Sequence, residues 1–116
     1  MTIQIIKESP ITKAELEQIA KKQFGDMVKA VVDVEKEIMA IGGELHADLE
    51  AMLVHHGSDQ GSCWGINLYT AKSENEWIEF NSMINIRPSQ GNYSRGVEDS
   101  SLQEKIKKIV HKLVIA

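Results

Sequence analysis

The sequence has few of the residues that point directly to a class of protein. A single cysteine, Cys63, occurs among 116 residues, so an internal disulfide and a paired-cysteine zinc site are both excluded. Only two prolines are present, and no proline-rich or serine-rich linker and no internal repeat divides the chain. These absences favour one globular domain, residues 1–116, with an ordinary hydrophobic core.

Clustered positive charge and long apolar runs are also missing. The formal net charge is -4, which argues against a broad nucleic-acid-binding face, because phosphate binding needs clustered basic residues. The apolar residues Ile3, Ile5 and Ile6 fall far short of a signal peptide, or of the roughly 20 apolar residues of a membrane span. We therefore predict a cytoplasmic protein that binds neither nucleic acid nor membrane.

Two amphipathic segments predict helices near the ends of the chain. Thr12 and Glu15 form a capping-box pattern, and apolar residues on one face extend the first helix from Lys13 to Phe24. The second helix follows Asp99, Ser100 and Ser101, each of which could serve as its N-cap. Its apolar residues recur at helical spacing: Leu102, Ile106, Ile109, Val110 and Leu113.

The chain between these helices is rich in β-branched and aromatic residues. Residues 27–34 and 38–41 predict a hairpin around the polar break at 35–37, and residues 64–70 and 77–87 predict two more strands. The sequence therefore predicts an α+β two-layer domain with a mainly antiparallel sheet of about five strands. The N-terminal and C-terminal helices pack on one face of it, and the other face is partly exposed.

Residues 44–54 fit two patterns. Leu45, Leu49 and Leu53 lie on one face of a helix, whereas polar and apolar residues alternate strictly from 44 to 51, as they do in a strand. We favour extended structure, because the alternation matches the strand template over eight residues and a turn-like His-His-Gly-Ser follows.

A strand would place Glu44, His46, Asp48 and Glu50 on one side of the sheet. Carboxylate and imidazole groups together could bind a divalent metal, and the His46–Asp48 pair suits proton transfer. This pattern predicts a metal-assisted hydrolase in which Glu44, His46 and Asp48 bind the metal or move protons. The alternatives are a solvated acidic strand face, or a helix that pairs Glu44 with Asp48 and His46 with Glu50.

The polar loop from residue 85 to residue 96 has two arginines and no acid. The guanidinium group matches carboxylate and phosphate, and Gly91 and Gly96 free the backbone for close approach to a ligand. The loop therefore predicts a binding module for a small anionic ligand. The alternative is that Arg87 and Arg95 pair with Glu79, with Glu98 or with acids of the segment 33–50 and hold the loop in place. The ligand-binding residues would be Asn85, Arg87, Gln90, Asn92, Ser94 and Arg95.

A third interpretation is a structural or protein-interaction domain whose uncovered sheet face forms a homodimer interface. The segments 26–34, 42–48, 64–67 and 84–92 resemble a family of small single-domain prokaryotic proteins of unknown function. This resemblance covers nearly the whole chain and implies one complete domain, but it implies no activity, cofactor or catalytic residue.

Overall fold

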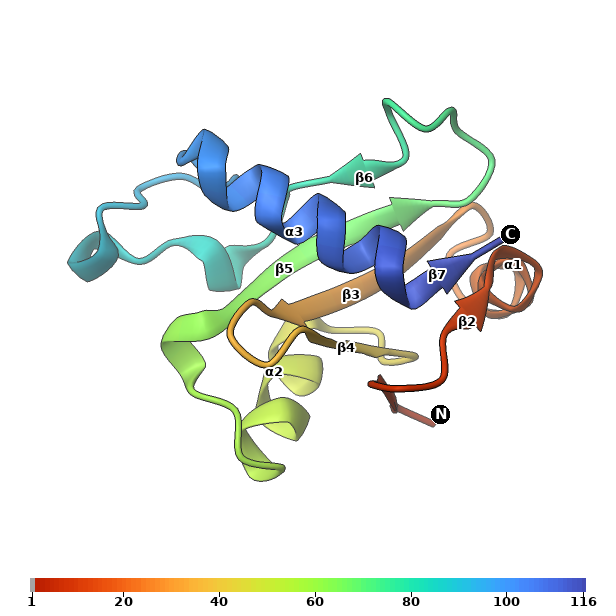
Figure 1. Ribbon diagram of the computed structural model, residues 1–116, viewed down its shortest axis with the longest axis horizontal. Coiled ribbons are helices and arrows are strands. Elements are labelled where there is room, and N and C mark those ends of the chain that lie inside the picture. Colours follow the sequence, from red (N-terminus) through yellow and green to blue (C-terminus); the bar gives the residue numbers. More distant parts are fainter. Residues whose placement is uncertain (1) are drawn as a thin grey trace.

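The computed structural model describes residues 2–116 as a central sheet with helices on both of its faces (Figure 1). Within these residues the main sheet has five antiparallel strands in the order β1-β4-β3-β5-β6, and a separate parallel pair joins β2 to β7. The strands of the main sheet are β1 (Gln4–Ile6), β3 (Met27–Asp33), β4 (Ile38–Ile41), β5 (Cys63–Tyr69) and β6 (Ile78–Glu79). The parallel pair consists of β2 (Ile11–Thr12) and β7 (Val114–Ile115).

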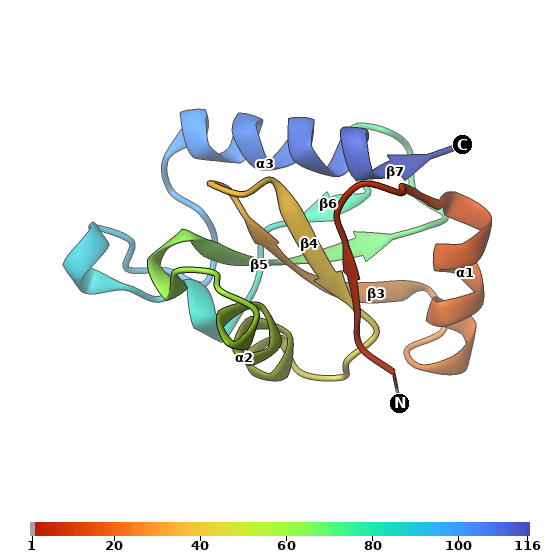
Figure 2. The same cartoon turned by 60° about the horizontal axis from the view of Figure 1, so that its bottom comes forward.

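Figure 2 shows α3 above the sheet, α2 below it and α1 at one end. In the described residues the α-helices are α1 (Lys13–Lys22), α2 (His46–His55) and α3 (Ser100–Leu113), and the short 3-10 turns are η1 (Gln60–Ser62), η2 (Met83–Asn85) and η3 (Pro88–Gln90). No helix within residues 2–116 is both long and apolar enough to cross a membrane. The prediction of an α+β fold with an antiparallel five-stranded sheet is confirmed.

The helix starts follow from the local sequence. Thr12 Oγ1 accepts a hydrogen bond from the Glu15 amide at 3.1 Å, and the Glu15 carboxylate accepts one from the Thr12 amide at 3.2 Å. This reciprocal pair satisfies two amides that the first helical turn leaves unpaired. The Asp99 carboxylate similarly accepts from the Ser101 amide at 2.8 Å. Helix α1 ends at Lys22, two residues before the predicted end at Phe24.

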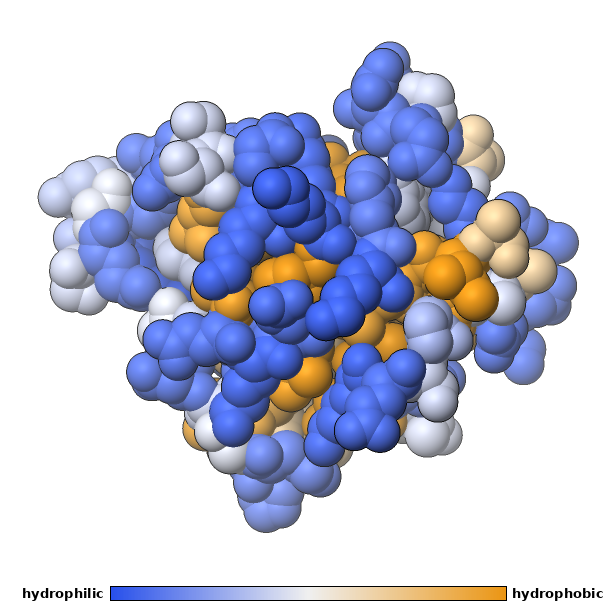
Figure 3. All heavy atoms as spheres, viewed as in Figure 1, coloured by the Kyte–Doolittle hydropathy of each residue, from blue (hydrophilic) through white to orange (hydrophobic). Residues whose placement is uncertain are grey.

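The larger core lies between the sheet and α3. Alternate residues of the central strands, such as Val28, Ala30 and Val32 of β3, point to this side. Ile106 and Val110 of α3 pack against them, and α1 contributes its buried residues to the same core. The outer side of α3 is largely hydrophilic (Figure 3). This layer therefore has the apolar inner face and polar outer face of an ordinary surface helix.

The prediction of extended structure for residues 44–54 is wrong, because most of this segment is helix α2. Leu49 and Leu53, four residues apart, are both fully buried against Val31 and Ala40 on the second face of the sheet. Burying these two leucines on one face of a helix stabilises the helix, although the alternation of polar and apolar residues also fits a strand. The prediction of two layers is wrong for the same reason, since α2 forms a third layer.

The predicted strand from residue 77 to residue 87 is also mostly wrong. Only Ile78 and Glu79 pair with β5. The chain then turns, because the Ser82 hydroxyl accepts a hydrogen bond from the Ile84 amide and initiates the 3-10 turn η2. The outer edge of β5 beyond this point is therefore contacted by side chains instead of a strand.

Candidate functional site

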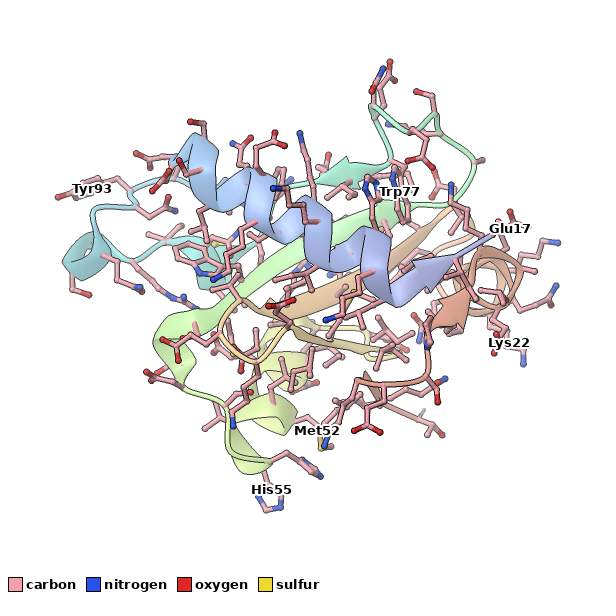
Figure 4. The ribbon with its side chains drawn as sticks, viewed as in Figure 1. Glu17, Lys22, Met52, His55, Trp77 and Tyr93 are labelled. Atoms are coloured by element: carbon pink, nitrogen blue, oxygen red, sulfur yellow. The ribbon has the colours of Figure 1, made fainter. Side chains whose placement is uncertain are left out.

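The loop 85–96 leaves the sheet beside β5 and projects from one end of the molecule (Figure 1). Tyr93 points outward at the tip of this loop, and 69% of it is exposed (Figure 4). The six predicted ligand-binding residues have different surroundings within the loop. Their contacts decide which of them are available to a ligand.

Asn85 and Asn92 are used to build the loop. Asn85 is fully buried, and its side chain accepts from the Gly65 amide at 2.8 Å while it donates to the Gly65 carbonyl at 2.9 Å. The Asn92 amide group donates to the carbonyls of Asn85 and Gly96, and its oxygen accepts from the Glu98 amide. Both side chains are therefore committed to hydrogen bonds within the protein.

Arg87 is held from three sides. Its guanidinium forms an ion pair with Glu50 of α2 at 2.9 Å, and the two side chains are only 11% and 13% exposed. It also donates to the Cys63 carbonyl and lies 4.7 Å from the centre of the Trp64 ring. This is the arrangement of the alternative interpretation, in which an acid of the segment 33–50 fixes the arginine in place.

A hollow of about 400 Å³ lies next to Arg87. The Gln90 side chain crosses towards η1 and donates to the Gly61 carbonyl at 3.0 Å. The positive charge at this hollow is already neutralised by Glu50, which weakens its attraction for an anion. The lining residues are Gln60, Gly61, Arg87, Ser89 and Gln90.

The amides near the tip of the loop hold a carboxylate of the protein itself. The Tyr93 and Ser94 amides donate to Glu98 Oε2 at 2.6 and 2.8 Å, and these two hydrogen bonds lower the pKa of the Glu98 carboxyl. The Ser94 hydroxyl accepts from the Gly96 amide at 3.2 Å. Ser94 therefore stabilises the turn.

Arg95 is exposed and is fixed by a single hydrogen bond, from its Nε to Asn81 Oδ1 at 2.8 Å. Its two terminal nitrogens make no hydrogen bond or ion pair within residues 2–116. One bond orients the guanidinium plane and leaves the terminal nitrogens available for bidentate contacts. Arg95 is thus the member of the predicted set that can offer a positive charge to a ligand.

A row of polar side chains crosses the sheet on the side of α2. Lys29 of β3 lies opposite Asn67 of β5, and Asn67 lies opposite Glu79 of β6. We call these three residues the polar row. The Asn67 amide group donates to Glu79 Oε1 at 2.8 Å and to the Asn81 carbonyl at 3.3 Å. These bonds connect the row to the residue that orients Arg95.

His46, the first residue of α2, adjoins this row. Its Nε2 donates to the Ile66 carbonyl at 2.8 Å, and the ring is 8% exposed. Burial lowers the pKa of His46, and the positive charges of Lys29 and Arg95 lower it further against the effect of the Ile66 hydrogen bond. A hydrogen bond with the Asn67 side chain also counters the effect of burial, and the lowered pKa leaves the imidazole largely neutral near pH 7.

The other members of the predicted metal site lie elsewhere. Glu44 and Asp48 are exposed and line a different hollow, of about 260 Å³, together with Ile3, Gly43 and Leu45. Glu44 precedes helix α2 and Asp48 lies in its first turn, whereas the His46 ring is bonded to the Ile66 carbonyl of the sheet. No group of three or more His, Cys, Asp or Glu residues in the part of the chain described is placed to hold a metal ion. The geometry does not assemble Glu44, His46 and Asp48 into one centre.

The sequence interpretation did not select Lys29, Asn67, Glu79 or Asn81 as site residues. The signal available was positional: Lys29 and Asn67 are polar residues inside otherwise apolar strand segments. Their pairing in the sheet depends on the register between β3 and β5, which the sequence alone does not specify.

Comparisons with known proteins give one relationship. No curated protein and no solved structure matches the chain. Residues 4–113 match a protein family described as protein of unknown function (DUF5674). This match spans almost all of the chain, in agreement with the single domain seen in the fold. The chain therefore belongs to the DUF5674 family of proteins of unknown function.

Proposed function

We propose that the protein is a cytoplasmic binding module for a small anionic ligand, and that Arg95 and Lys29 supply the positive charge of the site. The main support comes from the contacts and exposure of Arg95. Its guanidinium is oriented by Asn81, exposed, and without an acidic partner within residues 2–116. A fixed and unpaired guanidinium loses little side-chain entropy when it binds a carboxylate or phosphate.

Lys29 gives the site a second cation. It lies in the polar row on the side of the sheet where Arg95 is found, and both charges act on the same imidazole, that of His46. The Lys29 ammonium rests 5.1 Å from the centre of the Phe24 ring and makes no ion pair among the described residues. Two unpaired cations around a neutral imidazole favour an anion in this region.

The hollow beside Arg87 is the competing location. Its arginine is neutralised by Glu50 and also donates to the Cys63 carbonyl, so an anion would have to compete with an existing ion pair. Replacement of Arg87 should consequently lower the free energy of unfolding, whereas the affinity for the ligand should change little. The two arginines can therefore be distinguished by experiment.

The test is a calorimetric titration of inorganic phosphate and small carboxylates into the wild type and into charge-neutralising variants. We expect Arg95→Gln and Lys29→Gln each to weaken binding by about tenfold, the loss of one charge-assisted contact. Lys105→Gln removes the same charge from the exposed surface of α3 and serves as the matched control, with a change of less than about twofold.

Three outcomes would reject the proposal. Unchanged affinity in Arg95→Gln would show that this guanidinium binds no ligand. The second outcome is that Arg87→Gln, measured at a temperature where it is folded, loses affinity while Arg95→Gln keeps it. This result would place the site at the hollow beside Arg87. A wild type that binds none of these anions would instead favour a protein-interaction domain.

A further inference from the structure

We infer that the ligand is dipolar: besides its anionic group it carries a protonated amine, which the Glu79 carboxylate binds. This inference rests on the proposed function, because it adds a second charge to the ligand that Arg95 and Lys29 bind. It follows from the way in which the protein keeps Arg95 and Glu79 apart on one surface.

Two asparagines separate the guanidinium from the carboxylate, Asn81 through its side chain and its backbone carbonyl and Asn67 through its side chain. Arg95 Nε donates to Asn81 Oδ1 at 2.8 Å, and the Asn81 carbonyl accepts from Asn67 Nδ2 at 3.3 Å. The same Asn67 Nδ2 donates to Glu79 Oε1 at 2.8 Å. The opposite charges are thus the two ends of a hydrogen-bonded chain, and they do not pair with each other.

Glu79 has hydrogen-bond donors but no cation. Its Oε1 accepts from Asn67 and from the Tyr69 hydroxyl, the latter at 3.3 Å, and both donors are neutral. Within residues 2–116 no lysine, arginine or histidine lies within ion-pair distance of this half-buried carboxylate. Charges removed in part from water are usually paired, so an acid held in place without a counter-charge is suited to a cationic group of a ligand.

The spacing of the polar row limits the size of the ligand. Lys29 and Glu79 flank Asn67 on neighbouring strands, and neighbouring strands lie about 4.8 Å apart, so the two backbones are about 10 Å apart. The Lys29 ammonium lies over the Phe24 ring, and the Glu79 carboxylate is bonded to Asn67. We therefore expect the ligand to be a short amino-carboxylate, with a few carbon atoms between amine and acid.

The experiment compares three amino-carboxylates, β-alanine, 4-aminobutyrate and 6-aminohexanoate, each with the carboxylate that lacks the amine. Calorimetry at constant pH and ionic strength gives the affinity of each pair. We expect at least one amino-carboxylate to bind the wild type about threefold to fivefold tighter than its matched carboxylate, as expected for one partly exposed ion pair. In Glu79→Gln this preference should disappear, while the plain carboxylate binds equally well or more tightly.

A wild-type measurement complements the Glu79→Gln variant, whose lost hydrogen bonds could alter the fold. In NMR titrations the Glu79 side-chain carboxyl carbon should shift on addition of the preferred amino-carboxylate and not on addition of its matched carboxylate. Equal affinities within all three pairs would overturn the dipolar ligand and leave the proposed function intact, provided that the carboxylates still lose affinity in Arg95→Gln. Absence of any carboxylate binding would overturn the dipolar ligand, and absence of phosphate binding as well would overturn both.

Discussion

Arg87 and Arg95 stand eight positions apart in one acid-free stretch of sequence, yet the structure uses them differently. Arg87 is enclosed by Glu50, the Cys63 carbonyl and the Trp64 ring. Arg95 is exposed and held by one bond to Asn81. In this loop one arginine therefore holds the structure, and the other remains exposed with its terminal nitrogens unpaired among the described residues.

Asn85 is the residue through which both ends of the loop are fixed, so its removal should have the largest effect. Its side chain bonds the amide and carbonyl of Gly65 and the carbonyl of Arg95. Asn85→Ala would leave these buried groups unpaired, and we expect the free energy of unfolding to fall by about 3–5 kcal/mol. Urea denaturation measures this loss.

The control for this prediction is Asn75→Ala, which removes an exposed asparagine near the other end of the sheet. Its effect should stay within about 0.5 kcal/mol. A loss in Asn85→Ala as small as that of the control would mean that Gly65 finds other partners and that Asn85 does not anchor the loop.

The second prediction compares the two arginines directly. Arg87→Ala breaks a largely enclosed ion pair and leaves Glu50 without its cation, so we expect a loss of about 2–3 kcal/mol in the free energy of unfolding. Arg95→Ala should cost less than about 0.5 kcal/mol, because the side chain is exposed. A double-mutant cycle with Glu50→Gln assigns the first loss to the ion pair, and equal losses in the two arginine variants would remove the distinction.

A third, smaller effect should appear as pH dependence. The pKa of His46 is lowered in the folded protein from its ordinary value of 6.5, chiefly by burial. The unfolded chain therefore takes up more protons below pH 6.5, and stability should decrease from pH 6.5 downwards until the folded-state pKa is reached. Thermal unfolding between pH 7.5 and pH 5 should show a flatter profile for His46→Gln, and identical profiles would contradict this.

The smallest expected effect concerns Cys63, whose carbonyl binds Arg87. Burial, together with the negative charges of Asp33 and Glu50, raises the pKa of the Cys63 thiol to about 12. The thiolate is the reactive form, so a disulfide reagent at pH 8 should leave the folded protein unmodified. Arg95→Ala should be equally unreactive, and labelling should require denaturant. Rapid labelling of the folded wild type would show that the region around Arg87 opens readily.

The parts of the fold set by neighbouring residues were predictable. The capping box of Thr12 and Glu15 uses partners three residues apart and is confirmed. Of the three N-cap candidates at the start of the second helix, the structure uses Asp99. Residues 44–54 were mispredicted because helix and strand patterns coincide in them. The choice between the two depends on Leu49 and Leu53 packing against strands distant in sequence.

The candidate site was also predictable only in part. An ion pair between Arg87 and the acidic segment was one of two interpretations of the sequence, and the structure shows it with Glu50. The strand-like role of Asn85 was not predictable, because an asparagine at the end of an apolar strand pattern also suits a polar ligand. Its contact with Gly65 spans 20 positions and depends on where β6 ends.

The side chains along β5 also cover backbone groups at an edge of the sheet. Strand β6 pairs with only two residues of β5, and beyond it the β5 edge would expose backbone donors and acceptors to any extended chain. Asn85 occupies the amide and carbonyl of Gly65, and Arg87 occupies the carbonyl of Cys63. The contacts that hold the loop thus close the sheet edge, so loss of Asn85 should favour aggregation as well as unfolding.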